Sequence, residues 1–183
     1  MSESSELMKI RKAIRIVREL LSWFSCLLFA LIAALILRSY VYELVFVDGP
    51  SMEPTLYTGE YVFIEKLSVR FGKIERGEIL IVKFPDSENN YIKRAVGLPG
   101  ERVSVHGGVL YINGEALSES YINEYPIDYE MVEIFLGEDQ YFVLGDNRNN
   151  STDSHIVGPI EKSKIVGHAQ FVAWPFSEIK GLK

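Results

Sequence analysis

The pattern of apolar and polar positions divides the chain into two parts. From Leu20 to Leu37, eighteen successive residues carry no charge. That is about the shortest run that crosses a hydrocarbon core of roughly 30 Å at 1.5 Å per residue. Trp23 at one end, and Tyr40 and Tyr42 past the other, are placed as interfacial anchors would be. We therefore predict a transmembrane helix over residues 20–39.

A cleaved signal peptide and a buried core helix are the alternatives for this run. A signal peptide has a shorter apolar stretch followed by a small-x-small site, whereas this run ends in Leu-Arg-Ser-Tyr. Eighteen uncharged residues argue against a core helix, so we favour an uncleaved anchor. Five Lys and Arg residues lie between residues 9 and 18, against Arg38 alone just after the run. The positive-inside rule then makes residues 1–19 a cytoplasmic basic segment and places residues 40–183 outside.

After the anchor the pattern changes to short runs of β-branched and aromatic residues separated by Gly and Pro, which predict strands. These runs cover residues 41–47, 60–66, 78–84, 91–96, 102–105, 109–112, 140–144 and 165–174. Asn113-Gly114 is a strong type I′ turn signal, and residues 118–138 are irregular and acidic. We predict a mostly β chain in which residues 40–183 form one compact domain of short, coiled antiparallel β-sheets. Within it, residues 104–138 form a β-hairpin excursion.

Composition and net charge limit the classes of partner and ligand that we expect for the chain. The 183 residues have a net charge of −6 and a pI near 5.2, which argues against nucleic acid as a main partner. A single cysteine, Cys26, excludes an intrachain disulfide and argues against a cysteine-based metal site. The three histidines show no metal-ligand spacing. We expect neither a metal nor a cofactor.

One serine stands in a stiff turn, in the sequence Gly-Pro-Ser-Met-Glu-Pro-Thr-Leu from Gly49 to Leu56. Pro50 fixes φ before Ser51, Gly49 permits unusual torsions, and Pro54 prevents a helix. A nucleophile held there has few rotamers to lose and an apolar Met beside it. Serines next to proline are common in turns, however, so this stretch alone is weak evidence.

Lys93 lies in an apolar strand between Ile92 and Val96. It is either an exposed edge lysine, the commoner case because lysine is rarely fully buried, or it is buried against Ser51. Burial would disfavour the ammonium and lower its pKa from ~10.4. A neutral amine can accept the Ser51 hydroxyl proton and later deliver it to a leaving amine.

A Ser-His-Asp triad is the alternative chemistry. It would have to use His155 or His168 with Asp146 or Asp153. The chain has no Gly-x-Ser-x-Gly elbow, and nothing in the spacing favours such a triad.

The polar stretch from Gly145 to His155 would be a generic turn in most proteins. Here it is the third of three short sequence motifs, called boxes below, that follow the predicted anchor along the chain. The boxes are Ser-Met-x-Pro-Thr-Leu from Ser51, Lys-Arg-x-x-Gly-x-Pro-Gly from Lys93, and Gly-Asp-Asn-Arg-x-x-Ser-x-Asp-Ser from Gly145. With these boxes the chain resembles the type I signal peptidases, membrane-bound Ser/Lys proteases that remove signal peptides from exported preproteins.

The resemblance implies the signal peptidase/LexA-type fold on the extracytoplasmic side of a bacterial cytoplasmic membrane, with signal peptides and the lipid bilayer as partners. It implies Ser51 as nucleophile, Lys93 as general base, and cleavage after a small residue. Supporting roles fall to Ser151, whose hydroxyl would bond the lysine amine, to Asp153, and to a structural ion pair of Asp146 and Arg94. The implied substrate-binding residues are Met52, Leu56, Tyr91 and Ile92.

Two positions depart from the family pattern. Gly49 stands where some members have a serine that donates to the oxyanion, so the backbone N–H of Ser51 would carry more of that role. His155 stands where arginine is frequent, so a contact with Asp153 would be weaker and dependent on pH.

Other functions remain open at this stage. A self-cleaving regulator of the repressor type would also use Ser and Lys, but it carries a DNA-binding domain in place of an anchor. An inactive relative that only binds secreted proteins is a second alternative, against which the intact Ser51, Lys93 and Ser151 argue. An organellar peptidase is a third, although the boxes are closer to those of bacterial members.

Overall fold

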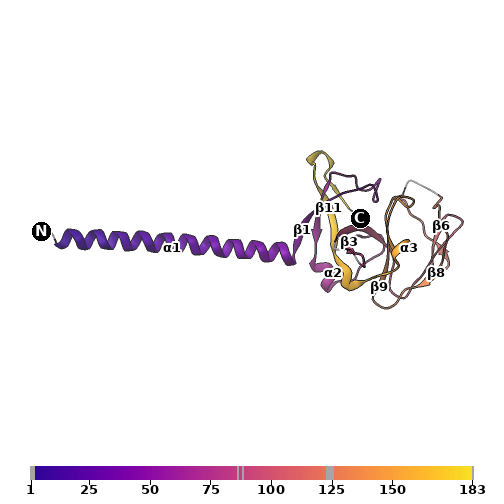
Figure 1. Cartoon of the computed structure of the whole chain (residues 1–183), viewed down its shortest axis with the longest axis horizontal. Helices are drawn as coiled ribbons and strands as arrows, with labels where there is room; N and C mark the ends of the chain where they lie inside the picture. Colours follow the sequence, from indigo (N-terminus) through magenta and orange to yellow (C-terminus); the bar gives the residue numbers. More distant parts are fainter. Residues whose placement is uncertain (1–2, 86, 88, 123–125, 183) are drawn as a thin grey trace. The chain divides into compact units, whose positions relative to one another are not determined.

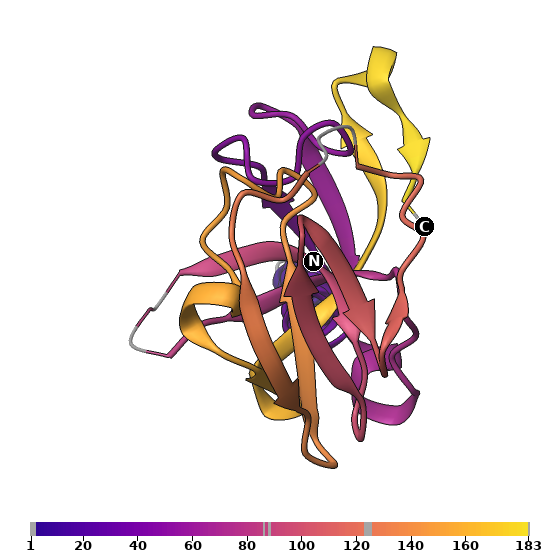
Figure 2. The ribbon, with the colours of Figure 1, turned by 90° about the vertical axis from the view of Figure 1, so that its right-hand side faces the viewer.

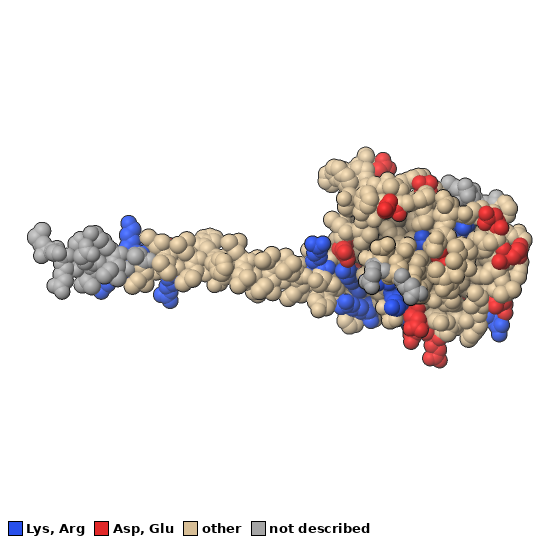
Figure 3. All heavy atoms as spheres, in the orientation of Figure 1, with Lys and Arg blue, Asp and Glu red and all other residues tan. Residues whose placement is uncertain are grey.

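The computed structural model describes residues 3–85, 87, 89–122 and 126–182. The chain divides into two compact units, Met1–Val41 and Tyr42–Lys183. The first is a single helix, α1 (Glu3–Tyr40), which joins the basic segment and the apolar run without a break (Figure 1). Its portion Ile14–Tyr40 contains an 18-residue window with a mean hydropathy of 2.6 and is long and apolar enough to cross a membrane. Figure 3 shows its middle as a band without charged side chains.

The second unit is mostly antiparallel β-structure. Each predicted strand is present to within one residue at either end. The strands are β1 (Tyr42–Phe46), β2 (Tyr61–Glu65), β3 (Ile79–Lys83), β4 (Asn90–Gly97), β5 (Arg102–His106), β6 (Val109–Ile112), β7 (Glu115–Ala116), β8 (Met131–Phe135), β9 (Gln140–Leu144), β10 (Ile160–Glu161), β11 (Ile165–Trp174) and β12 (Lys180–Gly181). The short helices are α2 (Leu67–Phe71) and α3 (Ser154–Val157), with 3₁₀ turns η1 (Lys162–Lys164) and η2 (Phe176–Glu178).

These strands form two sheets (Figure 2). The larger has the order β1-β2-β11-β3-β4-β9-β10, with β12 paired to β11, and the smaller has the order β7-β6-β5-β8. Buried residues of β4 and β9 belong to the same apolar cluster as those of β5 and β6, with Phe142 and Leu144 of β9 fully buried. The two sheets therefore share a core next to β4, the strand that carries Lys93.

The excursion is larger than the single hairpin predicted for residues 104–138. The β5–β6 hairpin is present, but β7 and β8 extend it to four strands. Asn113 and Gly114 both have positive φ, 53° and 82°, as the predicted type I′ turn requires. The pattern of residues does not predict β8, because this strand lies at an edge and does not alternate, with only Met131 buried.

Candidate active site

Ser51 and Lys93 meet inside the β unit. Lys93 Nζ lies 2.7 Å from Ser51 Oγ, and the lysine is only 2% exposed. It is buried because β4 runs between β3 and β9 with both faces covered from Ile92 onward. Burial lowers the pKa of the Lys93 ammonium from 10.5 to about 8, although the carboxylates of Asp153 and Asp146 oppose the shift.

The turn that carries Ser51 depends on the glycine before it. Gly49 has a φ of +97°, a region that residues with a side chain rarely adopt. Its N–H donates to Thr58 Oγ1 at 3.1 Å. A serine at position 49 would be strained in this conformation, which gives a physical reason for the departure noted in the sequence.

Asp146 and Arg94 form the predicted ion pair. Arg94 Nε and Nη2 donate to the two carboxylate oxygens of Asp146 at 2.8 and 2.6 Å, and both side chains are buried. Thr55 Oγ1 also donates to Asp146. The pair therefore joins β4 and the loop after β9 to the turn that carries Ser51.

Asp153 is fully buried at the start of α3. Its carboxylate accepts the Gly145 N–H at 2.8 Å and lies 2.6 Å from His155 Nδ1. The His155 ring also stacks on Tyr129, with centroids 4.1 Å apart. The expected contact between Asp153 and His155 is thus present.

Ser151 differs from expectation. Its Oγ is buried beside Gly145 but has no hydrogen-bond partner within the described residues, so the predicted bond to the Lys93 amine is not seen. A Cβ built at Gly145 would clash with Ser151 Oγ and with the Ser51 carbonyl oxygen. Asn147 N donates to that same carbonyl at 3.2 Å. The Gly145–Asn147 backbone therefore lies directly against Ser51.

A cleft of about 340 Å³ opens beside Ser51 and Lys93. Three of the predicted substrate-binding residues line it, namely Met52, Tyr91 and Ile92. Leu56 does not, because its side chain points into the apolar core and is completely buried. The rest of the lining is formed by Phe46, Val47, Asp48, Gly49, Asn89 and Asn90.

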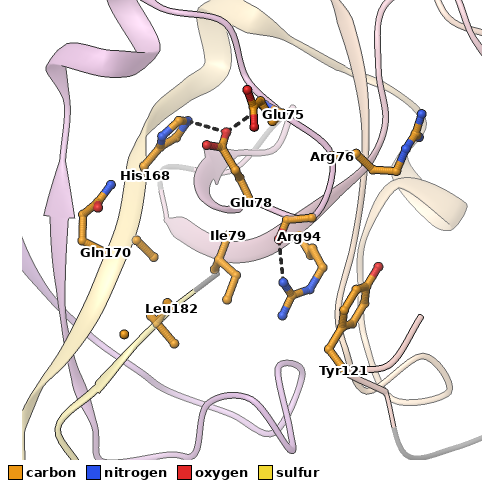
Figure 4. Close-up of a pocket in the computed structure, with 12 residues that line it drawn as sticks. Glu75, Arg76, Glu78, Ile79, Arg94, Tyr121, His168, Gln170 and Leu182 are labelled. Carbon is orange, nitrogen blue, oxygen red and sulfur yellow. Dashed lines mark hydrogen bonds and ion pairs between the residues drawn. The ribbon is translucent and has the colours of Figure 1, made fainter. Parts of the chain in front are cut away.

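A larger cavity of about 590 Å³ has His168 and Arg94 among its lining residues (Figure 4). His168 Nε2 lies 3.3 Å from Glu78, and its Nδ1 lies 3.1 Å from Ser68 Oγ. The other candidate, His155, contacts Asp153 and not Ser51. Within the described part of the chain, neither imidazole is hydrogen-bonded to Ser51, so the geometry gives no support to a Ser-His-Asp triad.

Sequence reasoning missed Arg148 and its partner Glu119. Their side chains form a fully buried, bidentate ion pair. In the sequence, Arg148 belongs to a polar turn, and Glu119 is one acid in an irregular stretch. The two lie 29 positions apart, so no local pattern could join them.

The family model for signal peptidase, peptidase S26, matches residues 20–174. The chain belongs to the signal peptidase family, peptidase S26. Its activity is that of this family, the removal of signal peptides from preproteins by a serine endopeptidase.

Its relatives in the family match over most of their length. A signal peptidase I from Bacillus licheniformis is 38% identical, over 88% of this chain and 92% of the relative. Signal peptidase I T from Bacillus subtilis is 37% identical, over 89% and 90%. A solved signal peptidase I from Enterococcus faecalis is 30% identical and covers 54% of this chain and 97% of its own, with a TM-score of 0.48.

Proposed function

We propose that the chain cleaves signal peptides with Ser51 as nucleophile and Lys93 as general base, after a small residue. The observation that carries this proposal is the 2.7 Å approach of Lys93 Nζ to Ser51 Oγ at a site where the lysine is buried. A lysine with a pKa of about 8 is neutral in about one tenth of the molecules at pH 7 and in about half of them at pH 8, and its neutral amine can accept a proton.

In the proposed mechanism, the Lys93 amine accepts the proton of the Ser51 hydroxyl as Ser51 Oγ attacks the scissile carbonyl carbon. The backbone N–H of Ser51 stabilises the oxyanion, since Pro50 has no N–H to offer. The Lys93 ammonium then protonates the leaving amine as the peptide bond breaks. Water, deprotonated by Lys93, hydrolyses the acyl-enzyme and restores Ser51. Asp153 supports the site by accepting the Gly145 N–H, and the Ser151 hydroxyl lies buried against Gly145.

The shape of the cleft supports a preference for small residues in an extended substrate. Met52 and Ile92 are almost completely buried and form apolar walls of the cleft, against which a small apolar side chain can pack. In the described structure, β9 pairs with β4 only from Arg94 onward, whereas β3 pairs with it from Asn90. An extended peptide can therefore add along Asn90–Ile92, where backbone bonds supply affinity and pockets supply selectivity.

The bilayer is the second partner that we propose, with α1 as a single-pass anchor whose N-terminus is cytoplasmic. The apolar length of α1 and the basic residues that precede it support this. In a Cys26→Ser background, a cysteine introduced at Ser177 should react with a membrane-impermeant thiol reagent on intact cells, and one at Met8 should react only after lysis. The reverse labelling pattern would show that the N-terminus lies outside the cell.

The bacterial origin of the relatives favours a bacterial membrane.

The catalytic roles are tested by incubating the detergent-solubilised protein with a preprotein. Ser51→Ala should abolish cleavage. Lys93→Arg should abolish it as well, because arginine keeps the charge but does not deprotonate at accessible pH. Cleavage by Ser51→Ala at the wild-type rate would remove Ser51 from the mechanism, and an active Lys93→Arg variant would show that the lysine is not the base.

A further inference from the structure

Among the residues that the structure describes, the ion pair of Arg148 and Glu119 is the most completely buried one outside the predicted site residues. Both side chains have no exposed surface. Arg148 Nη2 donates to Glu119 Oε1 at 2.6 Å, and Nη1 donates to Oε2. A buried ion pair adds little net stability compared with well-packed apolar residues, because both charges lose their hydration. Its geometry therefore suggests a role beyond stability.

The guanidinium of Arg148 reaches the active site through its third donor. Arg148 Nε donates to the carbonyl oxygen of Gly145 at 3.0 Å. Gly145 is the residue whose backbone lies against the Ser51 carbonyl oxygen and Ser151 Oγ, and whose N–H is held by Asp153. The Gly145 backbone is thus fixed through its N–H by Asp153 and through its carbonyl by Arg148, while Glu119 sets the orientation of Arg148.

Tyr121 connects this pair to the ion pair of Arg94 and Asp146. Its hydroxyl donates to Glu119 Oε1 at 2.6 Å, and the Arg94 guanidinium lies 3.9 Å from its ring centroid. Figure 4 shows Arg94 and Tyr121 next to each other on the wall of the larger cavity. Segment 119–121 therefore contacts both arginines that hold the loop after β9.

We propose that Glu119, through Arg148, is a positioning residue for signal-peptide cleavage: it holds the Gly145 backbone in the place that keeps Ser51 beside Lys93. This inference rests on the proposed function. It assigns the excursion that contains Glu119 a part in catalysis, although no side chain of that pair touches Ser51 or Lys93 in the hydrogen bonds described. A misplacement of about 1 Å in a catalytic group can lower the rate about 100-fold.

The first test is Glu119→Asp, which keeps both charges but withdraws the carboxylate by one methylene and draws Arg148 away from Gly145. The kcat for preprotein cleavage should fall about tenfold or more, with KM within about twofold, measured well below the unfolding temperature of each variant. The matched control is Glu133→Asp, which shortens the partner of Arg102 in an exposed ion pair and should leave kcat unchanged. Wild-type kcat in Glu119→Asp would overturn the proposal.

The second test separates positioning from stability. Glu119→Gln alone leaves the buried Arg148 charged and without the carboxylate that pairs with it, and should lower the unfolding temperature. Glu119→Gln with Arg148→Met removes both charges and should restore much of that loss, but it also removes the donor to Gly145, so kcat should stay low. Recovery of kcat together with stability would show a merely structural role. If the double variant does not fold, Glu119→Asp decides.

Ser51→Ala in the same series separates the two proposals. If Ser51→Ala cleaves like the wild type, the proposed mechanism fails whatever the Glu119 variants do. If Ser51→Ala is inactive while Glu119→Asp keeps the wild-type kcat, only the positioning role fails.

Discussion

Burial of Lys93 disfavours its charged form, and two nearby carboxylates partly offset this effect by stabilising the charge. Burial lowers its pKa to about 8, and Asp153 and Asp146 would raise it. Since the base must be neutral, kcat/KM should increase with pH through a midpoint near 8. The activity is lost as pH falls below that midpoint, because the amine becomes protonated.

Asp153→Asn tests this balance of charges. Removing the carboxylate removes an effect that raises the pKa of Lys93, so the midpoint of kcat/KM should move to lower pH by roughly one unit. Asparagine can still accept the Gly145 N–H, which preserves the loop. Asp139→Asn, at an exposed position, is the control and should not move the midpoint. A midpoint that stays in place, or moves up, in Asp153→Asn would show that this carboxylate does not set the basicity of Lys93.

A second prediction about a single residue concerns the close packing around Gly145. A Cβ there would clash with the backbone oxygen of Ser51, which cannot move aside as a flexible side chain can. Gly145→Ala should lower kcat about tenfold or more in the same cleavage assay. Gly137→Ala, where the nearest atom is the end of the Gln140 side chain at 3.3 Å, should be tolerated. Equal activity of the two variants would contradict the packing described for the site.

Single residues also show most clearly which parts of the site can be predicted from the sequence and which cannot. The local setting of Ser51 or of Lys93 is weak evidence by itself, and the two residues are predictable because the three boxes occur in order and carry the family resemblance. The pairing of Arg148 with Glu119 is not, since it depends on how the excursion folds back on the loop after β9. Leu56 was assigned to the cleft because it belongs to the serine box, but a turn sends neighbouring side chains in different directions, and this one enters the core.

At the scale of elements, the strands with strong apolar patterns were predictable and the weak ones were not. β9 and β11 have the predicted bounds, whereas β10 and β12 have two residues each and carry no periodicity to detect. The register that brings Lys93 to Ser51 follows from pairing between distant strands. That pairing is set by tertiary packing, which the pattern of a single segment does not contain.

The strand β9 also carries a prediction about stability. Phe142 is completely buried in the core that β4 and β9 share with the smaller sheet. Phe142→Ala should lower the free energy of unfolding by about 3–5 kcal/mol through lost burial and a cavity. Phe135→Ala, on the exposed part of β8, should change it by only about 0.5 kcal/mol. Urea unfolding of the detergent-solubilised chain, followed by tryptophan fluorescence, measures both, and similar losses would contradict this account of the core.

For the whole molecule, we expect an anchored α1 to raise the local concentration of the enzyme at the bilayer, where the apolar segment of the signal peptide would also lie. Removing residues 1–41 should leave cleavage of a short soluble peptide within a few-fold of the full chain, because the site lies within the second unit. Processing of a preprotein in vesicles should fall about 100-fold. Replacing residues 20–37 with another apolar sequence of the same length is the control and should retain vesicle processing. Equal processing by the truncated and full chains would show that the anchor is not needed.

The most direct test of the account is the titration of Lys93 itself. With ¹⁵N-labelled lysine, the Nζ resonance of Lys93 can be followed against pH in the detergent-solubilised protein and assigned by its absence from Lys93→Arg. The account predicts a midpoint near 8, well below the ordinary lysine value of 10.5. A midpoint at 10 or above would contradict it, because the amine would then remain protonated at the pH where the base is required.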